Sequence, residues 1–269
     1  MLQIIFFFTF LLIACFKLDA QDERLKQVNP SRYVTKTAWK KVKKHLIPRN
    51  HPAKLQLDEI FSRSRVLYDT ASMEAAGFDA LPPQHHTQMI VAKHPELKGH
   101  VIKAYLDVQD YYQDKVEEYF WIKRVRGAKL IREYLKEQQF DHLFKVPQKW
   151  LYLLPDKPSP PKICLRKRFI LIAEDMELYD QEENEKAWGS ERVTKEFLAA
   201  FYRITTELKL LDSSKPDNCR FSRDGKAAFV DTELYLKGEV KYYRLLPFLS
   251  PPMQEYWKDL SKGQKRSLD

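Results

Sequence analysis

The residues best suited to chemistry lie in two neighbouring segments in the second half of the chain. One reads Leu-Asp-Ser-Ser-Lys-Pro-Asp-Asn over residues 211–218, and the other reads Lys-Ala-Ala-Phe-Val-Asp-Thr-Glu over residues 226–233. Asn218 and Asp231 offer amide and carboxylate oxygens, which are ligands that Mg²⁺ accepts. The interval between them suits a hairpin that returns both side chains to one metal ion. Asp212 is the carboxylate that could act as a base and orient an attacking hydroxyl group.

A cation that could hold phosphate groups lies earlier in the chain. Lys103 comes late in the strand-like segment 100–106, and the long helix predicted after it carries Glu117 and Glu118. Phosphoryl transfer needs positive charge on the phosphates and a divalent ion that neutralises developing charge. We therefore predict that Lys103 lies over the phosphates and that one of the two glutamates holds it in place. Glu117 shares a helix face with Arg124, so it is the stronger candidate for the inward carboxylate.

The spacing of apolar residues predicts the elements that must position these side chains. Apolar residues that recur every three or four positions indicate helices, and short apolar runs between turn residues indicate strands. The fully apolar run 169–173 is predicted to be a central strand. The expected elements are an antiparallel hairpin of 88–93 and 100–106, a helix over 111–138, strands over 149–154 and 169–173, a helix from an N-cap at Ser190 to Lys209, short strands at Phe221 and 227–230, and a helix from Ser250-Pro251. This order predicts an α+β protein with two lobes.

The order of these pieces resembles the protein-kinase-like fold, including its small-molecule phosphotransferase branch. Lys215-Pro-Asp-Asn218 looks like the Lys-Pro-Glu-Asn of the kinase catalytic loop. Phe229-Val-Asp-Thr-Glu233 resembles the metal-binding segment of the aminoglycoside and choline phosphotransferases. The resemblance covers residues 60–240 and implies a truncated, mostly helical C-lobe. It also implies that ATP or another nucleotide binds with Mg²⁺, and that Glu174 and Met176 contact it where the chain crosses between the lobes.

Two further segments are similar to uncharacterised kinase-like proteins of intracellular bacteria such as the chlamydiae. These segments are Trp121-x-x-Arg124-x-x-Gly127-Ala128 and Val146-Pro-x-Lys-Trp150. This likeness implies no activity.

Because of three departures from the kinase pattern, the sequence is consistent with either an active or an inactive protein. The pattern places the catalytic Asp where this chain has Ser213, so Asp212 is the base only if a one-residue bulge repositions it. No glycine-rich loop covers the phosphates, since Gly77 is the only glycine before the predicted 95–99 turn. The segment after the second motif is too short to build the usual helices that hold a peptide. We therefore expect a small or unidentified acceptor, or no catalysis.

Composition and charge limit the class of protein. Of the 269 residues, 44% are hydrophobic and 31% are charged, which provides a core and excludes wholesale disorder. No apolar run after the first 20 residues is long enough to span a membrane, which excludes a polytopic membrane protein. The net charge of +9 favours phosphate groups or an anionic membrane surface as partners. The basic stretch 36–49, with an amphipathic helix predicted over 38–46, is the candidate membrane contact, and no sequence-specific nucleic acid is expected.

The N-terminus predicts export. Residues 2–16 form a nearly unbroken apolar stretch that is typical of a signal peptide. Cleavage after Ala20 would release a secreted protein, whereas cleavage before Cys15 would give a lipoprotein of the bacterial envelope. No Lys or Arg precedes the apolar stretch, so an uncleaved anchor also stays open. The expected organisation is a signal over 1–20, a basic segment over 21–54, an N-lobe over 55–175, a C-lobe over 176–260 and a basic tail over 261–269.

Three functions are consistent with this sequence. The first is an exported kinase-like protein that binds Mg-nucleotide and transfers phosphate to a small or unidentified acceptor. The second is a catalytically inactive binding module of the pseudokinase type. The third is a lipid-anchored envelope protein that acts through its basic segment. Cys164 and Cys219 are predicted to be free thiols in any of the three.

Overall fold

The computed structural model describes residues 31–80, 88–109, 117–162, 164–236 and 238–262. The chain divides into two compact units, residues 1–44 and 45–269. The predicted signal segment and residues 263–269 of the predicted basic tail lie outside the described residues, whereas residues 261–262 of that tail belong to the last helix. None of the helices in the described part of the chain combines enough length and apolar character to cross a bilayer.

The described part of the first unit contains the short helix α2 (Lys36–Val42). It begins earlier and ends earlier than predicted, and the 3₁₀ helix η1 (Lys43–His45) follows it. The side chain of Thr35 caps α2 by accepting a hydrogen bond from the amide of Ala38. Trp39 is buried whereas Lys40 is exposed, so the predicted amphipathic character is present. Contact between these lysines and an anionic membrane stays a prediction.

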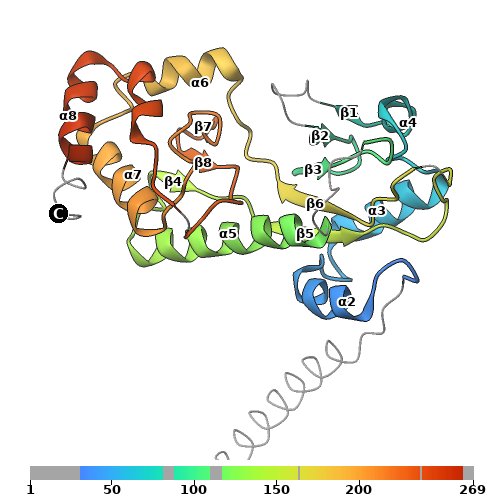
Figure 1. Cartoon of the computed structure of the whole chain (residues 1–269). Coiled ribbons are helices and arrows are strands. Elements are labelled where there is room, and N and C mark those ends of the chain that lie inside the picture. The colour runs from blue at the N-terminus through green and yellow to red at the C-terminus, as the bar shows by residue number, and fades with distance from the viewer. Residues whose placement is uncertain (1–30, 81–87, 110–116, 163, 237, 263–269) are drawn as a thin grey trace, which may run out of the picture. The chain divides into compact units, whose positions relative to one another are not determined.

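The second unit contains a five-stranded antiparallel sheet (Figure 1). Its strands are β1 (Asp79–Ala80), β2 (Ile90–Lys93), β3 (His100–Ala104), β6 (Phe169–Glu174) and β5 (Lys149–Leu153), in that spatial order. The predicted hairpin is confirmed, because β2 pairs with β3 in antiparallel register. The apolar run 169–173 is fully buried and lies between β3 and β5, as predicted.

Helices cover this sheet. Two of them, α3 (Pro52–Arg63) and α4 (Thr70–Ala75), contribute Leu57, Phe61 and Met73 to a buried apolar cluster with residues of β3, β5 and β6. The long helix α5 (Glu117–Glu137) contacts β5 and β6. It ends where the sequence predicts, and the predicted first turns of the helix fall on residues 110–116, outside the described part.

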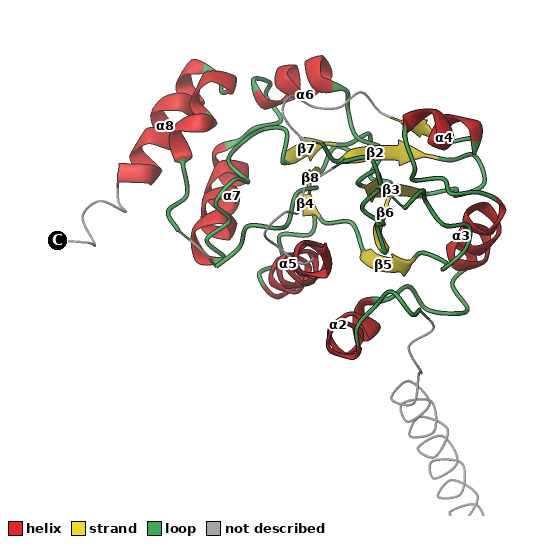
Figure 2. Cartoon of the chain, turned by 45° about the vertical axis from the view of Figure 1, so that its right-hand side comes forward, coloured by secondary structure: helices red, strands yellow, loops and turns green. Residues whose placement is uncertain are grey.

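A smaller sheet lies at the other end of α5. Its strands β4 (Phe144–Lys145), β8 (Ala227–Phe229) and β7 (Cys219–Phe221) are neighbours in that order. The antiparallel pairing of β7 with β8 confirms the hairpin predicted between the two motifs. The parallel pairing of β4 with β8 was not predicted, since a two-residue strand has no period in the sequence. Figure 2 shows α5 beside β4 and β5, the strands that it contacts in the two sheets.

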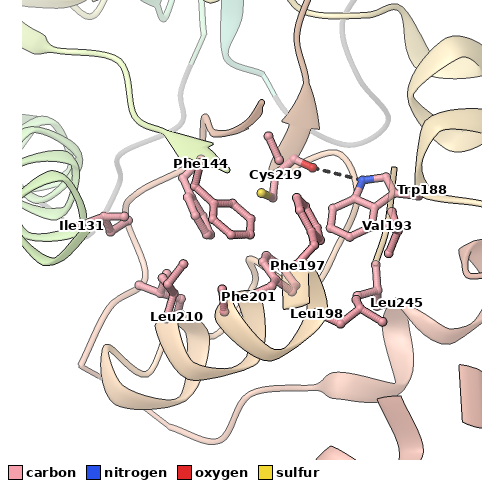
Figure 3. Close-up of a cluster of buried hydrophobic side chains, with 14 of the residues drawn as sticks. Ile131, Phe144, Trp188, Val193, Phe197, Leu198, Phe201, Leu210, Cys219 and Leu245 are labelled. Atoms are coloured by element: carbon pink, nitrogen blue, oxygen red, sulfur yellow. Dashed lines mark hydrogen bonds between the residues drawn. The ribbon is translucent and has the colours of Figure 1, made fainter. Parts of the chain in front are cut away.

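An aromatic core holds the smaller sheet against three helices: α6 (Gln181–Trp188), α7 (Lys195–Glu207) and α8 (Pro251–Lys262). Two 3₁₀ turns, η2 (Tyr242–Arg244) and η3 (Leu246–Phe248), precede α8. Phe144, Phe197 and Phe201 pack together beneath the sheet (Figure 3). The indole of Trp188 donates a hydrogen bond of 3.2 Å to the carbonyl oxygen of Cys219. Full burial of aromatic rings supplies most of the free energy that stabilises such a core.

The predicted N-cap of α7 is wrong. The side chain of Ser190 donates back to the carbonyl oxygen of Ala187 at 2.7 Å, so Ser190 closes α6 instead of opening the next helix. The true cap is Thr194, whose hydroxyl accepts from the amide of Phe197 at 3.1 Å. Both residues are typical N-caps, and the turn between the helices decides which of them is used.

The architecture is therefore α+β, as the sequence predicts, and its larger sheet has five antiparallel strands. Helix α5 serves both sheets, because its buried residues Ile131 and Leu135 belong to the aromatic core while its contacts with β5 and β6 reach the larger sheet. The predicted lobe boundary at residue 175 stays a prediction.

Candidate functional site

The two chemistry-bearing motifs meet at one small pocket. The pocket has a volume of about 150 Å³ and is lined by Asp212, Ser213, Asp231, Glu233 and Leu234. The β7–β8 hairpin brings the motifs together, since the amide of residue 230 donates to the carbonyl oxygen of residue 218 at 2.9 Å. The structure therefore unites the predicted base and the predicted metal-binding aspartate.

Two lysines from the large sheet reach the segment that carries Asp231. The ammonium groups of Lys103 on β3 and Lys149 on β5 donate to the carbonyl oxygen of Val230, at 3.3 and 2.9 Å. Lys149 also donates to the hydroxyl of Thr232 at 2.9 Å. Lys103 is 9% exposed and Lys149 only 4%, so both charges are shielded from water.

Burial lowers the pKa of both amines. The pKa of Lys103 falls from 10.5 to about 8, because desolvation outweighs the favourable charge of Asp231. The pKa of Lys149 lies well below its ordinary value, chiefly through desolvation and then through repulsion from Lys103. An anion placed beside these two amines would therefore gain from restoring their charge.

Arg124 of α5 bridges the two carboxylates of the second motif. Its guanidinium donates to Asp231 and to Glu233, each at 2.6 Å. Burial alone would raise the pKa of Asp231, but the charges of Arg124, Lys103 and Lys149 hold that pKa below its ordinary value. Asp231 is therefore a carboxylate anion near neutral pH.

Helix α5 also contacts the backbone of the segment that carries Asp231. The hydroxyl of Thr232 donates to the carbonyl oxygen of Arg124 at 2.6 Å. One turn further along, a Cβ added at Gly127 would lie 1.9 Å from the carbonyl oxygen of Thr232. Only glycine lets the helix and the segment approach so closely, which explains a glycine in the middle of a long helix.

The predicted partnership between Lys103 and the helix glutamates is absent in the structure. Glu117 accepts hydrogen bonds from the backbone amides of Arg168 and Phe169 and from the guanidinium of Arg168. Glu118 lies 3.4 Å from the same guanidinium. Both glutamates are buried at the first turn of α5, where they hold the start of β6. Burial raises the pKa of Glu117, and the Arg168 contacts only partly oppose this.

Glu174 and Met176 lie at the end of β6, where the chain leaves the large sheet. The carboxylate of Glu174 accepts from the amide of Gln148 at 2.7 Å, and the carbonyl oxygen of Met176 accepts from Lys145 at 3.2 Å. Both side chains are partly exposed. Their contact with a nucleotide stays a prediction.

The carboxylate of Asp212, the predicted base, lies beside two cationic side chains. Asp212 pairs with Arg244 at 2.8 Å and lies 3.9 Å from the ammonium of Lys215. The side-chain amide of Asn218 donates to the carbonyl oxygen of Asp212 at 2.8 Å, which ties the two ends of the first motif together. The carboxylate remains about one-third exposed and borders the pocket.

The donor types of the two motifs fit Mg²⁺, but of the two predicted ligands only Asp231 lines the pocket, whereas Asn218 does not. The Asn218 amide oxygen and the Asp231 carboxylate come from the two ends of one hairpin, and both are hard oxygen donors. One oxygen of Asp231 already accepts from Arg124, so an ion would use the other. Among the described residues, no group of three His, Cys, Asp or Glu side chains is arranged to hold a metal.

Sequence reasoning did not assign Lys149 or Arg124 to the site. Lys149 lies in the segment Val146-Pro-x-Lys-Trp150, but the likeness of that segment implied no activity and therefore did not mark the lysine as part of a site. Arg124 lies on the apolar stripe of α5 beside Gly127, and a charged residue on such a stripe is the signal that could have found it.

No family model matches this chain, and no curated protein matches its sequence. The residues around the pocket are therefore the basis on which a function can be proposed.

The lowered pKa of Lys103 predicts a pH dependence of stability. Between pH 8 and pH 10.5 the unfolded chain keeps a proton on this amine that the folded chain has released. The free energy of unfolding should therefore rise across this window, by up to about 3 kcal/mol from this residue. Urea unfolding of the parent and of Lys103→Met should show a smaller rise in the variant.

The matched control for that comparison is Lys93→Met on the neighbouring strand. Lys93 is 47% exposed and pairs with Asp175 at 2.6 Å. The Lys93→Met variant should show the same pH dependence of the free energy of unfolding as the parent. Equal pH profiles for Lys103→Met and the parent would refute the assignment of the titration to Lys103.

Proposed function

We propose that this chain binds a nucleotide with Mg²⁺ in a protein-kinase-like site around Asp231. One observation carries the proposal: two buried lysines from separate strands converge on the segment that carries Asp231, beside a pocket bordered by Asp212. Burying two amines is unfavourable unless an anion or hydrogen-bond acceptors compensate them. Phosphate groups are the anions that such a cluster recognises best.

The order of elements supports the same proposal. Lys103 lies on β3, the long helix α5 follows, and β6 leads to the segment with Glu174 and Met176. The helix α7 then precedes the first motif, and the β7–β8 hairpin separates Asn218 from Asp231. Each of these steps is one that the resemblance to kinases implies.

In this proposal the residues have distinct roles. Lys103 and Lys149 contact the phosphates, while Asn218 and Asp231 hold the divalent ion that neutralises charge on them. Glu174 and Met176 contact the base of the nucleotide. Asp212 would accept the proton of an acceptor hydroxyl if the protein transfers phosphate.

A catalytically inactive binding module is the second candidate. The ion pair of Asp212 with Arg244 favours it, because this contact already occupies the carboxylate that would have to accept the proton. The two candidates share the nucleotide site and differ only in turnover. Release of ADP from Mg-ATP by the purified chain would favour the enzyme, and binding without ADP release would favour the module.

Mg-nucleotide should stabilise the folded chain. A ligand that binds only the folded state adds about 2.7 kcal/mol at a hundredfold excess over its dissociation constant. We therefore expect Mg-ATP, Mg-ADP or Mg-GTP to raise the melting temperature by several degrees, and we expect Lys103→Met to lose most of this shift.

The exposed Lys93 again provides the control, since Lys93→Met should keep the shift of the parent. Unchanged melting curves for the parent with all three nucleotides would exclude the proposed function.

A further inference from the structure

The two carboxylates of the second motif are already bridged by a cation of the chain itself. Arg124 donates one nitrogen to Asp231 and another to Glu233, both at 2.6 Å, and its side chain is only 8% exposed. Each of these contacts is a charge-assisted hydrogen bond, which is among the stronger hydrogen bonds in proteins. A divalent ion that bridged the same oxygens of Asp231 and Glu233 would have to displace the guanidinium of Arg124.

The position of this arginine is fixed by its backbone as well as by its side chain. The hydroxyl of Thr232, between the two carboxylates, donates to the carbonyl oxygen of Arg124 itself. The helix also passes close to the carbonyl oxygen of Thr232 at Gly127. The guanidinium is therefore held in place before any ligand arrives, and the side chain loses little entropy in the bridge.

The local charge opposes a free divalent ion. Three basic side chains, Arg124, Lys103 and Lys149, contact the segment that carries the two carboxylates. A metal ion that approached Asp231 by itself would meet carboxylates that are already paired with the guanidinium of Arg124. Bound phosphate groups would make a divalent ion favourable here, because they add several negative charges beside Asp231 and Glu233.

We infer that Arg124 acts as a positioning residue that keeps divalent metal away from Asp231 and Glu233 until an anionic ligand is bound. Metal binding then requires a bound nucleotide, and only this requirement rests on the proposed function. The exclusion of metal by Arg124 concerns the metal alone and can be tested without any nucleotide.

The probe is Mn²⁺, followed by the loss of the electron paramagnetic resonance signal of the free ion. The full-length parent should show no saturable Mn²⁺ binding that depends on Asp231. Arg124→Gln removes the bridging cation from both carboxylates and should bind Mn²⁺ at least about tenfold more tightly than the parent, since the number of charged ligands sets divalent affinity. Arg124→Gln combined with Asp231→Asn should lose this gain.

Two further variants separate the charge of Arg124 from its bridge and its position. Arg124→Lys keeps the charge and cannot reach both carboxylates in parallel, so an intermediate Mn²⁺ affinity is expected. Arg126→Gln removes an exposed arginine from the same helix and should behave as the parent. A merely structural role of Arg124 would lower stability in the Gln variant without creating a metal site.

Two outcomes would overturn the inference. One is Mn²⁺ binding to the parent alone that Asp231→Asn abolishes, and this test needs no Arg124 variant to fold. The other is a folded Arg124→Gln or Arg124→Lys protein that gains no Mn²⁺ affinity. If neither arginine variant folds, the parent decides: Mn²⁺ that binds only together with a non-hydrolysable ATP analogue supports the inference. Failure of the analogue to bind excludes the proposed function instead.

Discussion

Replacing Gly127 by alanine is expected to lower the melting temperature of the chain by about 4–8 °C. The added Cβ would lie 1.9 Å from the carbonyl oxygen of Thr232 and 2.9 Å from the ring of Tyr235. The first neighbour is backbone and cannot rotate away, so helix and segment must separate. Overpacking of this kind costs about 3 kcal/mol, and the better helix propensity of alanine returns about 1 kcal/mol. The remaining 2 kcal/mol corresponds to about 4–8 °C for a domain of this size.

Calorimetry of Gly127→Ala and Gly189→Ala compares a glycine inside α5 with the C-cap glycine of α6. A Cβ at Gly189 would come no closer than 3.3 Å to the carbonyl oxygen of Phe248, so a much smaller change is expected there. Gly127→Ala should also lose nucleotide binding, because the carboxylates beside Thr232 move with the segment. An unchanged or higher melting temperature for Gly127→Ala would show that α5 and this segment are not packed as described.

Replacing Asp231 by asparagine is expected to remove the preference of nucleotide binding for Mg²⁺. In the parent, the carboxylate repels the phosphates when no metal is present and binds the metal when it is. Asp231→Asn should therefore bind nucleotide at least about tenfold more weakly in Mg²⁺, a loss of about 1.4 kcal/mol. In chelator the same variant should bind as well as the parent or better, because the repulsion is gone.

The comparison with Asp212→Asn makes this test specific. Asp212 borders the same pocket and pairs with Arg244, so its loss removes a carboxylate without removing a proposed metal ligand. Asp212→Asn should keep the parent's Mg²⁺ preference and lower only turnover. Isothermal titration of both variants, each below its own melting temperature, separates affinity from stability. An Asp231→Asn protein that retains the parent's Mg²⁺ preference would show that the metal assignment is wrong.

The local elements were predictable because their signals are local. The continuous apolar run of β6 predicted a central strand, and the turn at residues 223–226 predicted the β7–β8 hairpin. The choice between Ser190 and Thr194 as the N-cap was not predictable, because both have the right chemistry and the end of α6 decides between them.

The partners of the charged residues were harder to predict. The spacing correctly placed Glu117 on the inner face of α5, but it could not show that Arg168 competes with Lys103 for that carboxylate. Lys149 was missed because a lysine at the start of a strand has no distinguishing pattern. Such pairings depend on which elements pack together in three dimensions, and a single sequence does not contain that information in any short segment.

Affinity labelling can show whether nucleotide phosphates lie beside Lys103. An ATP analogue with an acyl group on its terminal phosphate transfers that group to a nearby lysine: the amine attacks the carbonyl carbon, and the nucleotide leaves. The pKa of about 8 at Lys103 makes this amine a better nucleophile near neutral pH than an ordinary lysine. Mass spectrometry of the digested protein should find the acyl group on Lys103 or Lys149, and excess Mg-ATP should prevent it. Labelling confined to exposed lysines such as Lys93, and unaffected by Mg-ATP, would contradict the account.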